Sequence, residues 1–157
     1  MAVKVKDELT PEGKKLLAAF WELEGLEVRI GFQSGENAKE NGADLAEVAA
    51  FNELGTVHIS SRPFLRNSVD THMGEIVPFV EDTLDRIVNS GMGAQDTLQR
   101  TGSFMKGLVQ KEIVSGHYAP NSPATIARKG SDVPLVDDGQ LRDSVNYQIV
   151  EKGSMDD

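Results

Sequence analysis

The stretch FNELGTVHISSRPFLRNSVD, residues 51–70, contains most of the signals that decide how this chain folds. It begins inside a helical pattern, which ends at Gly55 and Thr56. It then reaches Pro63, a residue that favours the first turn of a new helix. The same stretch also contains a histidine, two serines and two arginines. It is therefore either a catalytic loop or a joint between two helices.

The catalytic interpretation rests on His58, which could act as a base toward the hydroxyl of Ser60 or Ser61. Asp70 or Asp44 could orient such a histidine. Neither serine, however, lies in the G-x-S-x-G elbow that exposes a nucleophile in many hydrolases. The pattern therefore gives catalysis little specific support.

In the structural interpretation, the same residues cap and start a helix. Ser60 or Ser61 would cap a helix that starts at Pro63, and Phe64 with Leu65 would anchor that helix in the core. This interpretation needs no third catalytic group, so the sequence favours a joint, with an extended strap between the two helices.

Size and composition predict one soluble globular domain. The chain has 157 residues, of which 39% are hydrophobic and 26% charged. It has no cysteine, which excludes disulfides and thiolate chemistry, and its net charge of -9 argues against wrapping nucleic acid. No apolar run approaches the roughly 20 residues of a membrane span, and the N-terminus lacks a signal-peptide pattern. We expect a soluble chain that is not exported.

A helix from Pro63 to about residue 88 carries the clearest periodic signal. Its expected apolar stripe consists of Leu65, Val69, Met73, Ile76, Val80, Leu84 and Ile87. Pro78 lies inside it, and an interior proline removes a backbone hydrogen bond. We expect a kink or break just before Pro78.

The other patterns complete an α+β prediction. The expected elements are helices at 11–24, 43–54 and 94–115, strands at 2–6, 26–32 and 144–151, a polar loop at 33–42 and an extended bridge at 56–60. A small antiparallel sheet of 26–32 and 144–151, with 2–6 as a third candidate strand, would pack against the helices at 63–88 and 94–115. We expect a single domain over 1–157, with an N-terminal arm over 1–10 and a frayed tail over 152–157.

The segment 117–139 contains three of the six prolines and is long for a loop inside a compact domain. Ser122 and Pro123 predict the start of one short helical turn, which Gly130 ends. A proline-rich loop loses less entropy on docking, so we expect 118–138 to contact a partner, with Arg128 and Lys129 meeting acidic groups.

No metal or cofactor site is expected. The three histidines, His58, His72 and His117, lack metal-ligand spacing. The carboxylate pairs 137–138 and 156–157 lack the spacing of a calcium loop. Arg62 and Arg66 lie one helical turn apart and could grip a carboxylate of a neighbouring subunit or a phosphate.

Two runs in a fixed order resemble a family of small tail and neck proteins from long-tailed bacteriophages. The first is AAFNELGT, residues 49–56, followed by ISSRPFLR, residues 59–66. The second is PNSPATIARKGSDVPLVDDGQLRDSV, residues 120–145. Asp138 stands where the family usually has threonine, and Ser60-Ser61 replaces a more common Pro-Ala. Both substitutions suit a turn.

The resemblance implies a structural virion protein, not an enzyme, that acts in tail completion and head–tail joining as part of a homo-oligomeric ring. Its partners would be other phage neck and tail proteins, with genome DNA passing an acidic channel without specific binding and no membrane involved. The expected location is the virion, with assembly in the host cytoplasm. A tail terminator that caps the tail tube is the alternative within this class, and a small hydrolase using His58 is the alternative outside it.

Two residue sets follow from these arguments. The candidate interface residues are Arg62, Phe64, Arg66, Tyr118, Arg128 and Lys129. The structural motif residues are Glu53, Gly55, Thr56, Pro63, Pro123, Pro134, Asp137, Gly139 and Leu141.

Overall fold

A computed structural model of the protein describes residues 8–33, 39–40, 43–115, 117–130, 135 and 139–154. The fold is α+β, as expected, with a small antiparallel sheet beside a mainly helical body. The elements in chain order are α1 (Pro11–Glu24), β1 (Leu26–Gly31), β2 (Lys39–Glu40), β3 (Ala43–Asp44), α2 (Leu45–Leu54), α3 (Phe64–Asp70), α4 (Met73–Ser90), α5 (Ala94–Ser115), α6 (Pro123–Lys129), α7 (Gln140–Ser144) and β4 (Asn146–Glu151).

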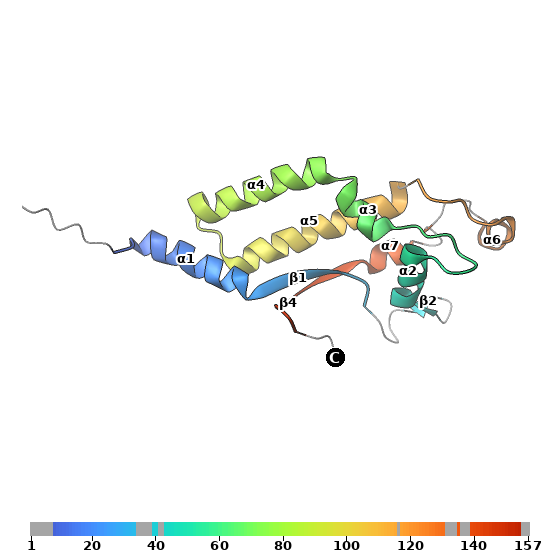
Figure 1. Ribbon diagram of the computed structural model, residues 1–157, viewed down its shortest axis with the longest axis horizontal. Helices are drawn as coiled ribbons and strands as arrows, with labels where there is room; N and C mark the ends of the chain where they lie inside the picture. Colours follow the sequence, from blue (N-terminus) through green and yellow to red (C-terminus); the bar gives the residue numbers. More distant parts are fainter. Residues whose placement is uncertain are drawn as a thin grey trace, which may run out of the picture.

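The elements form three layers around α5 (Figure 1). Strands β1 and β4 pair antiparallel, with Leu26 opposite Glu151, and α5 packs against both of them. Helix α4 lies on the other side of α5 and is held there by side chains, including a stack of Phe79 on Phe104 with ring centroids 3.9 Å apart. The expectation that the helix at 63–88 packs against the sheet is therefore wrong for α4.

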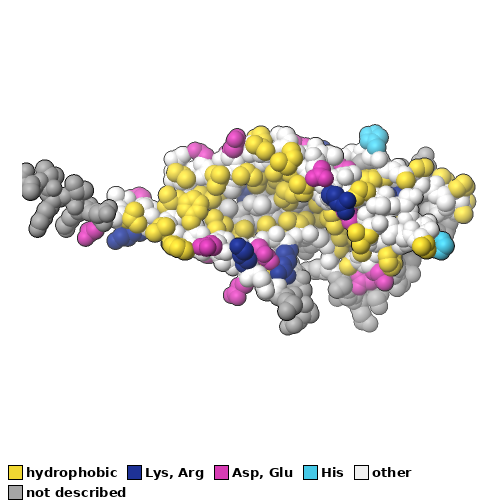
Figure 2. Space-filling model, viewed as in Figure 1, with side chains coloured by type: hydrophobic (Ala, Val, Ile, Leu, Met, Phe, Trp, Pro, Cys, Tyr) yellow, Lys and Arg dark blue, Asp and Glu magenta, His cyan; other side chains and the backbone are white. Residues whose placement is uncertain are grey.

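Helix α1 follows its sequence signals. The Thr10 hydroxyl accepts a hydrogen bond from the N–H of Gly13 at 3.1 Å, Pro11 opens the helix, and Gly25 caps its end. The helix nevertheless contains no buried residue. Its N-terminal half projects beyond the body in Figure 1, and Figure 2 shows hydrophobic side chains both on it and along α4.

The helix break lies earlier than Pro78. Helix α3 ends at Asp70, and α4 begins at Met73 and continues through Pro78. The carbonyl of His72 accepts the N–H groups of Glu75 and Ile76, so a new helix starts there. Pro78 then falls in the second turn of α4, where its missing N–H leaves the carbonyl of Gly74 without its helical hydrogen bond.

Three further expectations are corrected or fall outside the described residues. Part of the expected loop over 33–42 belongs to a short hairpin, in which β2 pairs with β3. The described part of the tail, 152–154, is bonded, because Lys152 N–H donates to the Gly25 carbonyl at 2.9 Å. The expected strand over 2–6 lies outside the described residues.

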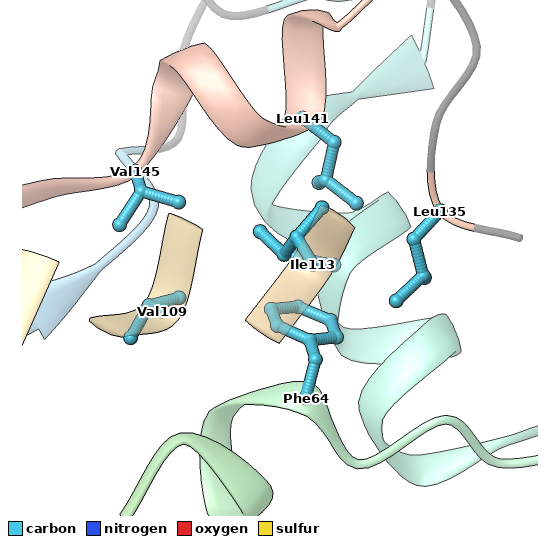
Figure 3. Close-up of a cluster of buried hydrophobic side chains, with 7 residues drawn as sticks. Phe64, Val109, Ile113, Leu135, Leu141 and Val145 are labelled. Carbon is cyan, nitrogen blue, oxygen red and sulfur yellow. The ribbon is translucent and has the colours of Figure 1, made fainter. Parts of the chain in front are cut away.

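The main hydrophobic core draws on both motif-bearing stretches (Figure 3). It is made of buried side chains from α2, α3, α5, α7 and the residues around α7, namely Ala49, Phe64, Val109, Ile113, Leu135, Leu141 and Val145. Phe64 is completely buried, and its ring meets Phe32 edge-on at 5.8 Å. The core therefore lies at the end of the molecule where α2, α3, α5 and α7 meet.

Candidate functional site

The joint between α2 and α3 is built on the carboxylate of Glu53. Its Oε2 accepts the backbone N–H of Leu65 at 2.8 Å, and its Oε1 accepts that of Arg66 at 3.3 Å. These N–H groups belong to the first turn of α3, which has no side-chain cap of its own because Pro63 stands at the capping position. An acid on one helix thus caps the next helix, where negative charge is favourable. Neither Ser60 nor Ser61 serves as the cap.

Gly55 and Thr56 fold the connection into a tight turn. Gly55 has φ +78°, and a Cβ there would lie 2.9 Å from the N atom of Ser61. The Thr56 hydroxyl accepts the N–H groups of His58 and Ile59 at 3.1 and 3.0 Å. The Thr56 N–H donates to the Ile59 carbonyl at 2.8 Å. The expected extended strap over 56–60 is therefore wrong, because these bonds curl the backbone back on itself.

Arg62 ties the two motif-bearing stretches together. Its backbone N–H donates to the Asn52 carbonyl at 2.6 Å, and its Nη1 donates to Asn52 Oδ1 at 3.1 Å. Its Nε donates to the Ala119 carbonyl at 3.0 Å, and its Nη2 to Asn121 Oδ1 at 3.1 Å. Burial lowers the pKa of Arg62 from its ordinary value, yet a guanidinium stays charged at neutral pH. The Arg62 side chain thus binds two residues that lie 57 and 59 positions further along the chain.

A buried polar cluster, which the sequence did not reveal, lies beside this joint. The Tyr118 hydroxyl donates to Glu112 Oε1 at 2.5 Å, and Glu112 Oε2 lies 3.8 Å from His72 Nδ1. Burial and the hydrogen bond to Glu112 raise the pKa of Tyr118 well above its ordinary value. His72 lies at the break between α3 and α4 and Glu112 lies on α5, so these contacts hold the break against α5. Only the Glu112–Tyr118 pair is close in sequence, so no spacing pattern points to His72.

The candidate interface residues divide into two groups. The assignment of Phe64 to an interface is wrong, because this side chain lies wholly in the core. Arg62 and Tyr118 make hydrogen bonds within the chain, so the structure gives both an internal role. Arg66 is exposed. The side chains of Arg128 and Lys129 lie outside the described residues.

The remaining motif residues have local roles where the structure describes them. Pro123 occupies the first turn of α6, whose cap, Ser122, accepts the N–H of Thr125 at 3.2 Å. Gly139 has φ +87° just before α7, and Leu141 is buried in the core. Pro134 and Asp137 lie outside the described residues.

The catalytic candidates are not brought together. Ser61 donates its hydroxyl to the Glu53 carbonyl at 2.7 Å, and Asp44 caps α2 by accepting the N–H of Ala46. His58 is exposed, and within the described ranges no hydrogen bond to its ring is found. A search of the same residues for three or more clustered histidine, aspartate and glutamate side chains finds no candidate metal site. The described geometry therefore supplies no nucleophile–base pair at the joint.

A second candidate site is the apolar surface of α4. The expected stripe is split: Ile87 is buried and Ile76 half-buried, whereas Met73, Val80 and Leu84 point outward. Together with their neighbours on the same side of the helix, the outward residues form what we call the α4 stripe, which comprises Met73, Val77, Val80, Leu84 and Val88, each 45–55% exposed. The apolar period in the sequence does not distinguish this stripe from the inward face of the helix, because both repeat every three or four residues.

In the described part of the chain, no helix combines the length and the apolarity needed to cross a membrane. Comparisons of the chain with family models, with curated proteins and with solved structures find no match.

Proposed function

We propose that the chain is a structural virion protein of the neck or tail of a long-tailed bacteriophage, where it acts in tail completion and head–tail joining as a subunit of an oligomeric ring. The observation that carries this proposal is the amount of apolar surface. The described residues expose fifteen large hydrophobic side chains, against twelve hydrophobic residues in the buried core. Five of them lie together along α4, and contiguous apolar patches of this kind are typical of assembly interfaces.

The arrangement of the two motif-bearing stretches supports the narrower part of the proposal. The resemblance to phage neck proteins rests on residues 49–66 and 120–145, which are far apart in sequence. They meet through the Arg62 hydrogen bonds and through the contact of Phe64 with the cluster that contains Leu141. The two stretches are thus in contact at the joint and in the core, within the part of the chain that the structure describes.

Removal of the protein from assembling phage tests the function. We expect separated heads and tails, or defective tail ends, by electron microscopy, with rescue by a wild-type copy supplied in trans. Tails of the wrong length would instead favour a tail terminator. Normal, joined and infectious particles would overturn the proposal.

A His58→Ala variant tests the hydrolase alternative in the same assay. Because the His58 side chain is exposed, the substitution should leave the fold intact and rescue assembly fully. A hydrolytic activity that the wild-type protein shows and this variant loses, with assembly unaffected, would favour the hydrolase.

A further inference from the structure

Strand β1 has an edge that pairs with no other strand in the described part of the chain. Its sheet consists of β1 and β4, and α5 packs against one face of this sheet. Figure 1 shows α1 running on beyond the start of β1 rather than alongside the strand. A two-stranded sheet is only marginally stable alone, so β1 gains stability from a further strand.

The hydrogen bonds of the sheet show which backbone groups lie on this open edge, which we call the β1 edge. The N–H of Lys152 donates to the carbonyl of Gly25 at 2.9 Å, and these two residues lie opposite each other just beyond the paired strands. Bonded and non-bonded pairs alternate along an antiparallel ladder. Leu26, Val28 and Ile30 therefore point their N–H and carbonyl groups away from β4. Within the described ranges, no hydrogen bond to these groups is found.

The side chains of the same three residues face α5. Tyr147 lies against Gly102 of α5 and is directly opposite Ile30. Alternate residues of a strand share a face, so Leu26 and Val28 lie on that side as well. All three are half-buried and none is charged. The β1 edge therefore lacks the inward-facing charge with which many proteins prevent the pairing of edge strands.

The other edge of the sheet is less suited to pairing. By the same alternation, the outward groups of β4 belong to Tyr147, Ile149 and Glu151. The carbonyl of Glu151 already accepts the N–H of Ser154 at 3.0 Å. The side chain of Glu151 is also a charge on the side of the sheet that faces α5, which opposes the addition of a strand.

The charges on the solvent side of β1 make its edge complementary to itself. Glu27 and Arg29 lie on that side, with 35% and 32% of their side chains exposed. When two copies of β1 pair antiparallel about Val28, Glu27 of each copy lies opposite Arg29 of the other. Such a pair is non-bonded, so its side chains come closest and opposite charges stabilise it. Pairing centred on residue 27 or 29 instead places like charges opposite each other.

The same register suits the apolar side of the sheet. Leu26 lies opposite Ile30 of the second copy, and Val28 lies opposite Val28, so the three residues with outward backbone groups meet the same three residues. Helix α5 packs against both strands, so its two copies lie about two strand spacings, or roughly 10 Å, apart. This separation is within the range of about 8–10 Å at which helices pack.

We propose that the β1 edge pairs with the β1 edge of a second copy of this chain, which forms a four-stranded antiparallel sheet across a two-fold axis. Arg29 also binds Glu27 and the carbonyl of Ser154 in its own chain, so the four charges of the two copies form one alternating network. The inference goes beyond the proposed function, because an isologous contact joins two copies and does not by itself build a ring.

Charge reversal tests this pairing, because Glu27 and Arg29 lie on the solvent side of the sheet. Glu27→Arg and Arg29→Glu are made singly, and each protein and their equal mixture are examined by native mass spectrometry and analytical ultracentrifugation. The two variants differ in mass, so mixed dimers are distinguished from like dimers. Glu47→Arg, at an exposed position on α2, replaces Glu27→Arg in a second mixture as the control for overall charge.

We expect the wild-type chain to form dimers and each single variant to raise the dissociation constant at least about tenfold, because like charges then face each other twice. In the mixture of Glu27→Arg with Arg29→Glu, opposite charges face each other again, so mixed dimers should form with about the wild-type affinity. The ion pair within one chain cannot explain this rescue, since each variant carries only one sign of charge at the two positions. The control mixture should show no rescue. A monomeric wild-type chain, or a mixture that associates no better than its components, would overturn the proposal.

Two proline substitutions locate the edge that pairs. Val28→Pro removes an outward N–H of β1, and Ile149→Pro removes the outward N–H directly opposite on β4, while the bonds between the two strands remain. Val28→Pro should be monomeric and Ile149→Pro should still dimerise, with circular dichroism as the check of folding. The reverse result would place the contact on β4 and overturn the proposal. If a proline variant fails to fold, the charge-reversal mixture decides, and the particle phenotype tests the neck function separately.

Discussion

Gly102→Ala should destabilise the protein although alanine is the better helix former. Gly102 is buried in the middle of α5, against β4. A Cβ at this position would lie 2.3 Å from Cδ2 and 2.6 Å from Cγ of Tyr147. Cγ is near the root of the side chain, so a rotation of the ring tip cannot relieve the overlap, and either the whole Tyr147 side chain or the backbone of helix or strand must shift.

The size of the effect follows from two opposing terms. Alanine gains about 1 kcal/mol over glycine inside a helix. Overpacking a filled contact costs about 1–3 kcal/mol. Since the overlap here is severe, the upper part of that range applies, and we expect a net loss of about 1–2 kcal/mol in the free energy of unfolding.

Gly107 offers a matched control on the same helix. It is exposed, and a Cβ there would meet nothing within 4 Å, so Gly107→Ala should stabilise the protein by about 0.5–1 kcal/mol. The same substitution, five residues apart, is thus expected to have opposite signs.

Urea unfolding followed by circular dichroism measures both variants, and thermal unfolding gives a second readout. The expected net loss for Gly102→Ala corresponds to a fall of roughly 2–8 °C in Tm for a chain of this size. A Gly102→Ala protein as stable as Gly107→Ala would refute the close packing of α5 against Tyr147.

Other substitutions test the joint and its surroundings. Glu53→Ala should lower the free energy of unfolding, measured in urea, by about 1–2 kcal/mol, because α3 loses its cap. The control Glu47→Ala, on the exposed face of α2, should change it by less than about 0.5 kcal/mol. Equal effects of the two substitutions would contradict the cap. Because burial raises the pKa of Tyr118, the folded state holds that proton more tightly, so its contribution to stability is complete below about pH 10 and is lost as the pH rises further. Tyr118→Phe should weaken this alkaline loss and Tyr147→Phe should leave it in place; an unchanged profile in Tyr118→Phe would argue against the buried hydroxyl. Arg62→Lys should speed proteolysis of the segment after α5, because an ammonium cannot reproduce the fork of hydrogen bonds to Ala119 and Asn121, and unaltered cleavage would contradict the bridge.

Local signals in the sequence were sufficient for most of the secondary structure. Thr10 and Pro11 start α1, Gly25 ends it, and Ser122 and Pro123 start α6. The bounds expected for α5 are those observed. Caps, prolines and glycines act through neighbours three or four residues away, so sequence reasoning reaches them.

The candidate site was only partly accessible in this way. The run from Glu53 to Phe64 predicted a joint between two helices, and the chain has one there. No local signal indicates that Glu53, rather than Ser60 or Ser61, caps α3, since the acid lies 12 residues before the N–H group that it binds. The residues at 56–60 predict an extended strap, whereas Gly55 and Thr56 form a tight turn that brings the acid to the helix.

The positions of α4 and Gly102 were decided by the tertiary structure alone. The apolar period of residues 65–87 predicts a helix with one buried side, but periodicity does not say which residues turn inward or which layer covers them. A glycine in the middle of a helix is unfavourable by local propensity, and only Tyr147, 45 residues further along the chain, shows why glycine stands at position 102. Hydrogen bonds within one turn are fixed by local sequence, whereas contacts between distant segments depend on how helices and strands pack, and only the folded chain brings those segments together.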